Sequence, residues 1–209
     1  MRQEGQTKYD IDSFLSALRL AKRKIRYRKN ETIFSQGDPS TEMFYIESGA
    51  LKLSVVSAAG KGAVIAIKGG GTLLGESCIA LGQPVRFHSA VALTELRLVK
   101  IDRAAILQML SAGGEKAISF ISFLLQQNAN LQEDLAARLV GSTQQSLARV
   151  VSSLREFEAY QHSPLLPHIS QETIAETLGI TRQRVNALMK AAGATQASVR
   201  PSGKGSPHS

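Results

Sequence analysis

Side chains suited to contact the base edges of DNA gather in one segment, ISQETIAETLGITRQRVNALMKA, at residues 169–191. Arg182 matches the hydrogen-bonding pattern of guanine, and Gln183 and Asn186 match that of adenine, in the major groove. Arg184 and Lys190 suit phosphate contacts, which position a protein without specifying sequence. The segment therefore predicts a sequence-reading contact with double-stranded DNA.

The same segment predicts two helices joined by a tight turn. Ser170 and Thr181 are good N-caps, and Gly179 supplies the left-handed conformation that the turn requires. This helix-turn-helix places Arg182, Gln183 and Asn186 on the outer face of the second helix, and Ser170 and Gln171 at the start of the first add to the predicted contacts. A helix pair used only for packing is the alternative. The residues expected to face inward are Ile174, Ala175, Leu178, Val185, Leu188 and Met189.

Upstream, residues 32–100 alternate short apolar segments with turn signals such as Gly-Asp-Pro and Gly-Gly-Gly. In LKLSVV and LRLVKI the apolar residues recur with a period of two, which is typical of strands. Six to eight short antiparallel strands in a barrel or roll are expected. Before them, residues 10–20 predict a short amphipathic helix capped by Asp12 or Ser13.

Helical periodicity returns after the strands. Residues 103–111 predict a short helix, Gly113-Gly114 a break, and residues 115–140 a long helix. Apolar residues at alternating spacings of three and four on the long helix predict a coiled-coil seam between two copies of the chain. The polar Asn128 on this seam favours one register, although a helix packed on its own domain is the alternative. The predicted seam consists of Ile121, Leu124, Asn128, Leu131 and Leu135.

A further amphipathic helix is expected at residues 144–159. Its inward side chains are Leu147, Val150, Val151, Leu154 and Phe157.

Charge, cysteine content and the lack of long apolar runs limit the classes of protein to which this chain can belong. The 209 residues carry a net charge of +8, which suits a polyanionic partner. Cys78 is the only cysteine, which excludes an internal disulfide and an iron–sulfur cluster built from this chain's thiolates. The first residues lack the apolar stretch of a signal peptide, and no run approaches the ~18 apolar residues of a membrane span. A cytoplasmic protein without membrane contact is expected.

No catalytic motif is recognisable, so the chain is not expected to be an enzyme. Gly69-Gly70-Gly71 lacks the Lys-Ser/Thr of a phosphate-binding loop and is interpreted as a turn. No metal-ligand spacing occurs. A basic run ahead of the first expected strand is interpreted as a solvated helix face or as a contact with phosphate or a membrane surface; it comprises Arg19, Lys22, Arg23, Lys24, Arg26, Arg28 and Lys29.

The order of these parts resembles the Crp/Fnr family of bacterial transcription regulators over about residues 10–190. The motifs that carry the resemblance are IFSQGDPSTEMFYIESGALKLSV, GES at residues 75–77, the long helix and the helix-turn-helix segment. The resemblance implies an α+β fold: an antiparallel, cyclic-nucleotide-binding-like β-roll sensor, a long dimerisation helix and a winged-helix-like DNA-binding domain. It also implies a homodimer that reads a palindromic operator, with RNA polymerase as a further partner.

The expected domains are 1–113 for the N-terminal helix and sensor, 114–140 for the dimerisation helix, 141–193 for the helix-turn-helix domain and 194–209 for a disordered tail. The family's two-stranded wing is expected to be missing, because the sequence turns small and polar after Met189. An alternative function follows: a ligand-binding β-roll dimer with impaired DNA binding that acts through protein partners.

The effector is left unknown. In family members that bind cyclic nucleotides, a Gly-Glu pair holds the ribose, and an Arg followed by Ser or Thr holds the phosphate. Gly75, Glu76 and Arg86 match this pattern, but Phe87 cannot donate the hydroxyl hydrogen bond. An internal Glu76–Arg86 ion pair is the alternative. Leu131 and Gln132 are expected where such members supply hydroxyls to the purine, so the resemblance argues against a cyclic nucleotide without excluding one. Haem ligation by Cys78, His88 or His162 is a weaker alternative.

Overall fold

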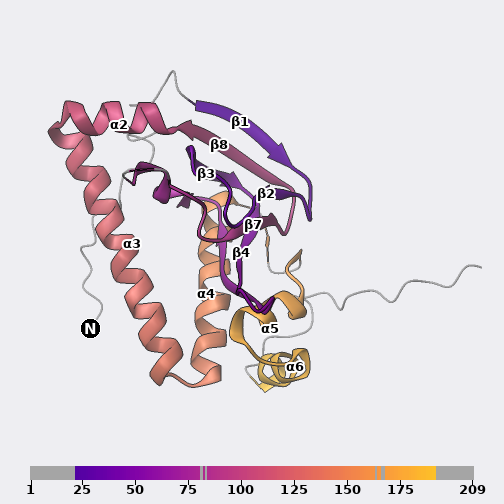
Figure 1. Cartoon of the computed structure of the whole chain (residues 1–209). Helices are drawn as coiled ribbons and strands as arrows, with labels where there is room; N and C mark the ends of the chain where they lie inside the picture. Colours follow the sequence, from indigo (N-terminus) through magenta and orange to yellow (C-terminus); the bar gives the residue numbers. More distant parts are fainter. Residues whose placement is uncertain (1–21, 81, 83, 163, 166–167, 192–209) are drawn as a thin grey trace, which may run out of the picture.

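The computed structural model describes residues 22–80, 82, 84–162, 164–165 and 168–191. Eight strands form two four-stranded antiparallel sheets, as the sequence predicted, and helices follow them (Figure 1). The first sheet has the spatial order β1 (Lys22–Tyr27), β8 (Leu96–Asp102), β3 (Glu42–Ser48) and β6 (Leu73–Leu74). The second has the order β2 (Thr32–Phe34), β7 (Ser89–Ala92), β4 (Ala50–Val56) and β5 (Gly62–Gly69).

The basic run was expected ahead of the first strand, but its residues Lys22, Arg23, Lys24 and Arg26 lie within strand β1. Strand β1 pairs with β8 along its whole length, with Ile25 opposite Leu98 and Tyr27 opposite Leu96. Ile25 and Tyr27 are partly buried, whereas Arg23, Lys24 and Arg26 are exposed. The alternation of two apolar residues with cations was a weak strand signal, which the charge of the run obscured.

Both faces of the first sheet are partly covered. Phe44 and Ile46 of β3 lie in the core between the two sheets. The neighbouring Met43 and Tyr45 point to the other face, where they pack with Phe120 of a helix. This double burial explains the continuous apolar run MFYI, because a strand covered on both faces has no solvent side.

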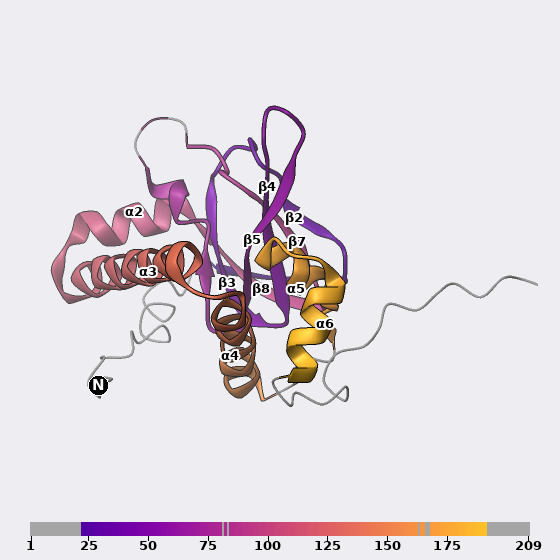
Figure 2. The ribbon, with the colours of Figure 1, turned by 90° about the horizontal axis from the view of Figure 1, so that it is seen from below.

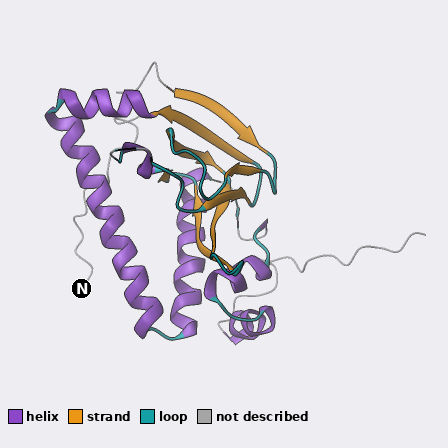
Figure 3. Cartoon of the chain, viewed as in Figure 1, coloured by secondary structure: helices purple, strands orange, loops and turns teal. Residues whose placement is uncertain are grey.

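Two helices cover that outer face. Helix α2 (Arg103–Ala112) follows β8 directly, and the chain turns at Gly113, whose φ is 67°, into α3 (Gly114–Val140). The positive φ favours glycine and separates the two helices at the predicted break. Figure 3 shows α3 as a long helix that runs beyond the edge of the sheets.

The last three helices are α4 (Thr143–Gln161), α5 (Gln171–Leu178) and α6 (Arg182–Ala191). A capping box starts α4: the Ser142 hydroxyl accepts from the Gln145 N–H, and the Gln145 side chain accepts from the Ser142 N–H. Figure 2, the view from below, shows α4, α5 and α6 gathered against the roll. The predicted N-terminal helix at 10–20 and tail at 194–209 lie outside the described residues, and so does the place of the wing after α6.

One apolar core joins the roll to these helices. Ala50 and Leu93 of the roll pack in the same buried cluster as Leu154 of α4, Ile174 of α5 and Val185 of α6. The Lys52 Nζ of β4 lies 3.1 Å from the Glu176 Oε2 of α5. The helix-turn-helix is therefore docked on the sensor roll in this structure.

The end of α4 lies very close to the Gly69-Gly70-Gly71 segment. The hydroxyls of Tyr45 and Tyr160 are hydrogen-bonded to each other, and Gln161 Oε1 accepts from the Gly49 N–H at 2.8 Å. A Cβ at Gly69 would lie 2.5 Å from the ring of Phe157 and 2.7 Å from its Cβ. Gly69 therefore makes room for α4, in addition to the turn role expected from the sequence.

We expect Gly69→Ala to destabilise the fold by roughly 1–3 kcal/mol, because the added methyl overlaps the Phe157 side chain near its backbone. Urea unfolding followed by circular dichroism measures the change. Gly62→Ala on the same strand is the matched control, since its Cβ would meet only the Val55 carbonyl oxygen at 3.8 Å. Equal stability of the two variants would show that the close approach is not needed.

Candidate functional site

Helices α5 and α6 form the predicted helix-turn-helix. The Ser170 hydroxyl accepts from the Thr173 N–H at 3.1 Å, and the Thr181 hydroxyl accepts from the Arg184 N–H at 3.3 Å. Gly179 ends α5 with a φ of 66°, as its place in the turn required. The inward residues are confirmed: Ile174, Ala175, Val185, Leu188 and Met189 are buried, and Leu178 packs against them.

The predicted DNA-contacting side chains lie on the opposite face of this pair. Arg182, Gln183, Arg184 and Lys190 of α6 are exposed, and so is Thr181 before it. Asn186 is partly buried, as are Ser170 and Gln171 at the start of α5. The exposed guanidinium and amide groups can donate hydrogen bonds to an acceptor-rich surface, and their contacts with DNA stay predictions.

Arg86 is the centre of the predicted effector pocket. Its side chain is 3% exposed, and its guanidinium lies 4.4 Å from the centre of the Phe34 ring. Nη2 donates to the Glu42 carbonyl oxygen at 2.9 Å and lies 3.6 Å from Glu42 Oε1. Within the described part of the chain, Nε and Nη1 have no hydrogen-bond partner. Two buried donors without an acceptor give this pocket the chemistry to hold an anion.

Gly75 permits this position of Arg86. Its φ is 87°, and a Cβ there would lie 2.5 Å from Arg86 Nη1. The predicted neighbours Gly75 and Arg86 are thus brought together. Arg86 forms its ion pair with Glu42 and not with Glu76, so the alternative of an internal Glu76–Arg86 ion pair is wrong.

Glu76 faces the long helix instead. Gln127 Nε2 of α3 donates to Glu76 Oε1 at 3.3 Å. Burial raises the pKa of Glu76, while hydrogen bonds from the backbone and the nearby charges of Lys68 and Arg86 offset part of that rise. The helix residue beside Glu76 is therefore Gln127, one turn earlier on α3 than the expected Leu131 and Gln132.

The other side chains near the pocket are less suited to chemistry. Phe87 is 71% exposed and points away from the core that holds Arg86. Burial raises the pKa of the Cys78 thiol to about 11, which keeps it protonated at neutral pH. Burial lowers the pKa of His88, as do Arg86 and Lys68. Over the residues the structure describes, no group of three or more His, Cys, Asp or Glu side chains could hold a metal ion.

Helix α3 has an exposed apolar face that differs from the predicted seam. Leu124 packs partly buried against the core under the first sheet, because α3 must cover Phe120 and its neighbours there. Ile121, Leu131 and Leu135 are exposed, as the predicted seam requires, and Asn128 is exposed too. The other exposed large apolar residues of α3 are Ile118, Leu125, Leu139 and Val140.

Comparison with known proteins gives a consistent result. The cyclic nucleotide-binding domain model matches residues 24–112. The chain is 25% identical over 177 residues to the CRP-like cAMP-activated global transcriptional regulator of Mycobacterium tuberculosis. This alignment covers 83% of this chain and 79% of the relative. It is 28% identical over 167 residues to the global nitrogen regulator of a Nostoc species, over 78% of this chain and 75% of the relative. These matches support a transcription regulator of the Crp/Fnr type.

The family fold extends over most of the chain. The structure of FixK2 from Bradyrhizobium japonicum superposes with a TM-score of 0.70 at 14% identity, over 84% of this chain and 86% of that one. This likeness concerns the fold alone. None of the helices in the described ranges has a stretch long and apolar enough to span a lipid bilayer.

Sequence reasoning missed two residues beside the predicted effector site, Glu42 and Gln127. Glu42 is the first residue of β3 and reaches Arg86 only because β3 lies beside the Gly75 turn. Gln127 reaches Glu76 because of the way α3 is rotated on the sheet. Neither residue belongs to a recognisable motif, so only the tertiary packing reveals that they lie at this site.

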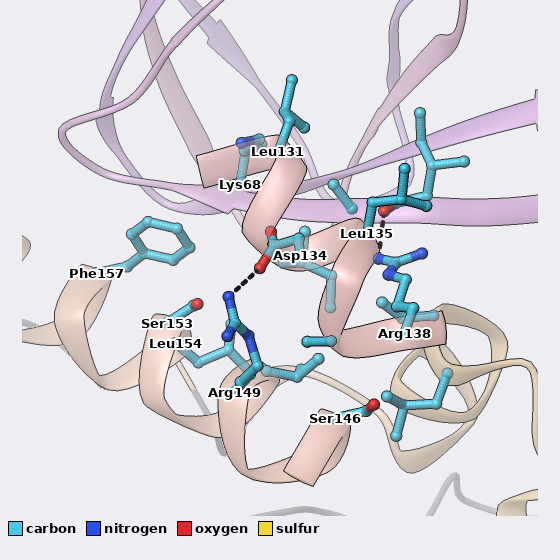
Figure 4. Close-up of a pocket in the computed structure, with 17 residues that line it drawn as sticks. Lys68, Leu131, Asp134, Leu135, Arg138, Ser146, Arg149, Ser153, Leu154 and Phe157 are labelled. Carbon is cyan, nitrogen blue, oxygen red and sulfur yellow. Dashed lines mark hydrogen bonds and ion pairs between the residues drawn. The ribbon is translucent and has the colours of Figure 1, made fainter. Parts of the chain in front are cut away.

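A cavity of about 300 Å³ lies where β5 meets α3, α4 and α5 (Figure 4). Leu131 and Leu135 line it together with Phe157. Across it, Arg149 Nη2 lies 2.7 Å from Asp134 Oδ1, and Arg138 Nη2 donates to the Ile65 carbonyl oxygen at 2.8 Å. Leu131, expected beside the effector, thus lies at the junction between the roll and the helices.

We expect Glu76→Gln to stabilise the fold at neutral pH. Burial raises the pKa of Glu76, so the folded state binds protons more tightly there than the unfolded state. Stability therefore falls as pH rises from the ordinary glutamate pKa to the raised pKa, and the loss is complete above it. Below the ordinary glutamate pKa both states are protonated, so the gain disappears. The substituted amide keeps an oxygen for Gln127.

Thermal unfolding at neutral and acid pH measures this difference. Glu133→Gln, at an exposed carboxylate on helix α3, is the control. A stabilisation of the Glu76 variant that stays equal at both pH values would contradict the role of its charge.

Proposed function

We propose that this chain regulates transcription as a homodimer that reads a palindromic operator with paired α6 helices. The observation that carries the proposal is the exposed face of α6, with Arg182, Gln183 and Arg184 near its N-terminus. The buried Val185, Leu188 and Met189 hold the opposite face on α5 and α4. A helix held this way can enter the major groove and present its side chains to base edges.

The relatives support DNA as the partner. The Mycobacterium tuberculosis and Nostoc proteins are named as global regulators, and each aligns over more than three quarters of this chain. Twofold symmetry of the protein would be matched by a palindromic site with half-sites one helical turn apart. RNA polymerase is the further partner expected of such a DNA-bound regulator.

The exposed face of α3 supports the dimer. Ile118, Ile121, Leu125, Leu135 and Leu139 recur on it at spacings compatible with a coiled-coil seam, and Leu125 and Leu139 are 63% and 76% exposed. Such a stripe is covered when two α3 helices pack against each other. Asn128 and Gln132 occupy the middle of the stripe at the same spacing, where polar residues favour one register.

Leu125→Asp is expected to convert the dimer to a monomer at micromolar concentration. A carboxylate without a partner in an apolar interface costs about 2 kcal/mol or more for each copy. Sedimentation equilibrium measures the change. Asn130→Asp, exposed on another face of the same helix, is the control and should remain dimeric. A wild-type monomer would contradict the proposed dimer.

Selection of bound sites from a random DNA pool tests operator reading. The wild-type chain is expected to recover a palindrome, and Arg182→Ala/Gln183→Ala should lose it, because each base contact contributes about 1–3 kcal/mol of discrimination. Lys61→Ala/Lys116→Ala removes two exposed cations outside α6 and should recover the same palindrome.

If no protein enriches any site, operator reading is contradicted. The leading function then becomes that of a β-roll dimer which acts through protein partners.

A further inference from the structure

The cavity of about 300 Å³ in Figure 4 lies where the roll meets the helices that follow it. Its walls come from β5 of the roll, from α3 and α4 on either side of the turn at Gly141, and from the end of α5. Its volume is at the lower end of the range of about 300–1,000 Å³ that is typical of small-molecule pockets. A molecule held in it would contact the roll and the helix-turn-helix at once.

Most of the side chains that line this cavity are apolar. Leu154 is buried, and Ile67 and Phe157 pack against the same core cluster. Leu131 and Leu135 of α3 are 59% and 57% exposed, so the cavity is bordered by apolar surface that is in contact with water. A hydrocarbon group bound beside these two leucines would remove them from water, which is favourable.

Three cations and one carboxylate complete the lining. Asp134 Oδ1 lies 2.7 Å from Arg149 Nη2, so one cation already has an acidic partner. Arg138 Nη2 donates to the neutral Ile65 carbonyl oxygen at 2.8 Å. Among the described residues neither Arg138 nor Lys68 forms an ion pair. The cavity therefore keeps two positive charges without a paired carboxylate.

The position of Glu76 does not change this balance. The charge of Lys68 lowers the pKa of Glu76, but the hydrogen bond of Glu76 Oε1 is with Gln127. Glu76 is also outside the set of residues that line the cavity. An anion inside the cavity would thus meet Asp134 as the single carboxylate among the described lining residues.

These features select the chemistry of a ligand. The planar guanidinium of Arg138 matches the geometry of a carboxylate, and its Nε and Nη1 donors are not used by the Ile65 carbonyl. Asp134 would repel an anion of higher charge more strongly than a single carboxylate. Exposed leucines beside an unpaired guanidinium suit a molecule that is apolar along its length and carries one negative charge at its end.

We propose that this cavity binds a small amphipathic carboxylate. The hydrocarbon part lies against Leu131, Leu135 and Phe157, the carboxylate pairs with Arg138, and Lys68 adds to the positive field. The bound molecule holds α4 and α5 on β5 and stabilises the docked arrangement of the helix-turn-helix. The inference goes beyond the proposed function, since this binding does not require DNA.

Isothermal titration calorimetry on the full chain tests the site with three probes. Octanoate carries both the chain and the carboxylate and is expected to bind. Octanol has the same chain length without the charge and should bind about tenfold more weakly, because a hydrogen bond to a charged group is lost. Acetate has the charge without the chain and should give no measurable binding.

Arg138→Gln is expected to weaken octanoate binding by about tenfold and to leave octanol binding unchanged. Arg155→Gln removes the same charge from an exposed position of α4 outside the cavity, and it should bind octanoate like the wild type. Equal octanoate affinity of Arg138→Gln and Arg155→Gln would overturn the assigned carboxylate contact.

Ala137→Leu extends a side chain into the cavity and should abolish the binding of both octanoate and octanol. Ala136→Leu adds the same group at the next, exposed position of α3 outside the cavity and should retain binding. Circular dichroism checks that both variants are folded. Unchanged binding by a folded Ala137→Leu variant would place octanoate elsewhere and overturn the proposal.

Two further outcomes separate this site from the proposed dimer and from operator reading. Octanoate that binds only the Leu125→Asp variant would show that the α3 helix of a second copy covers the cavity, and would overturn the site in the assembled protein. Octanoate binding by a wild-type chain that enriches no DNA site would support this inference and contradict the proposed function alone.

Discussion

The packing of α4 against the end of β5 is the constraint on which the rest of this structure depends. Phe157 occupies space that only a glycine at position 69 leaves free, and Tyr160 and Gln161 bond to the β3–β4 region of the roll. Once α4 is held there, α5 follows on the same apolar core and α6 on α5. The place of α6 is thus set by contacts far from it in the sequence.

Helix α3 has two differently placed faces. Its first half covers the outer face of the first sheet through Phe120, and its rotation there turns Gln127 toward Glu76. The apolar residues on its far side are exposed in a single chain, because α3 extends from the roll to α4 beyond the edge of the sheets. Helix α3 therefore contacts Glu76 of the predicted effector site and also carries the proposed dimer contact.

Charge is distributed along the side of the molecule that also carries α6. The Arg86 guanidinium is buried on aromatic rings and ion-paired with Glu42, so it contributes little to the surface. The exposed cations of β1, β8 and α6 contribute to the surface charge instead. A net charge of +8 produces a local positive field only where several cations lie close together on the surface.

The sequence by itself determined the local features of this protein. The period of two in LKLSVV, the caps Ser170 and Thr181, Gly179 in its turn and the inward residues of α5 and α6 all depend on neighbours a few residues away, and the structure confirms them. Only the tertiary structure decided that the basic run is a strand, that Arg86 pairs with Glu42 and that Leu124 faces the roll. Strand partners and helix rotation are chosen by packing between distant segments, which the spacing of residues along one segment does not encode.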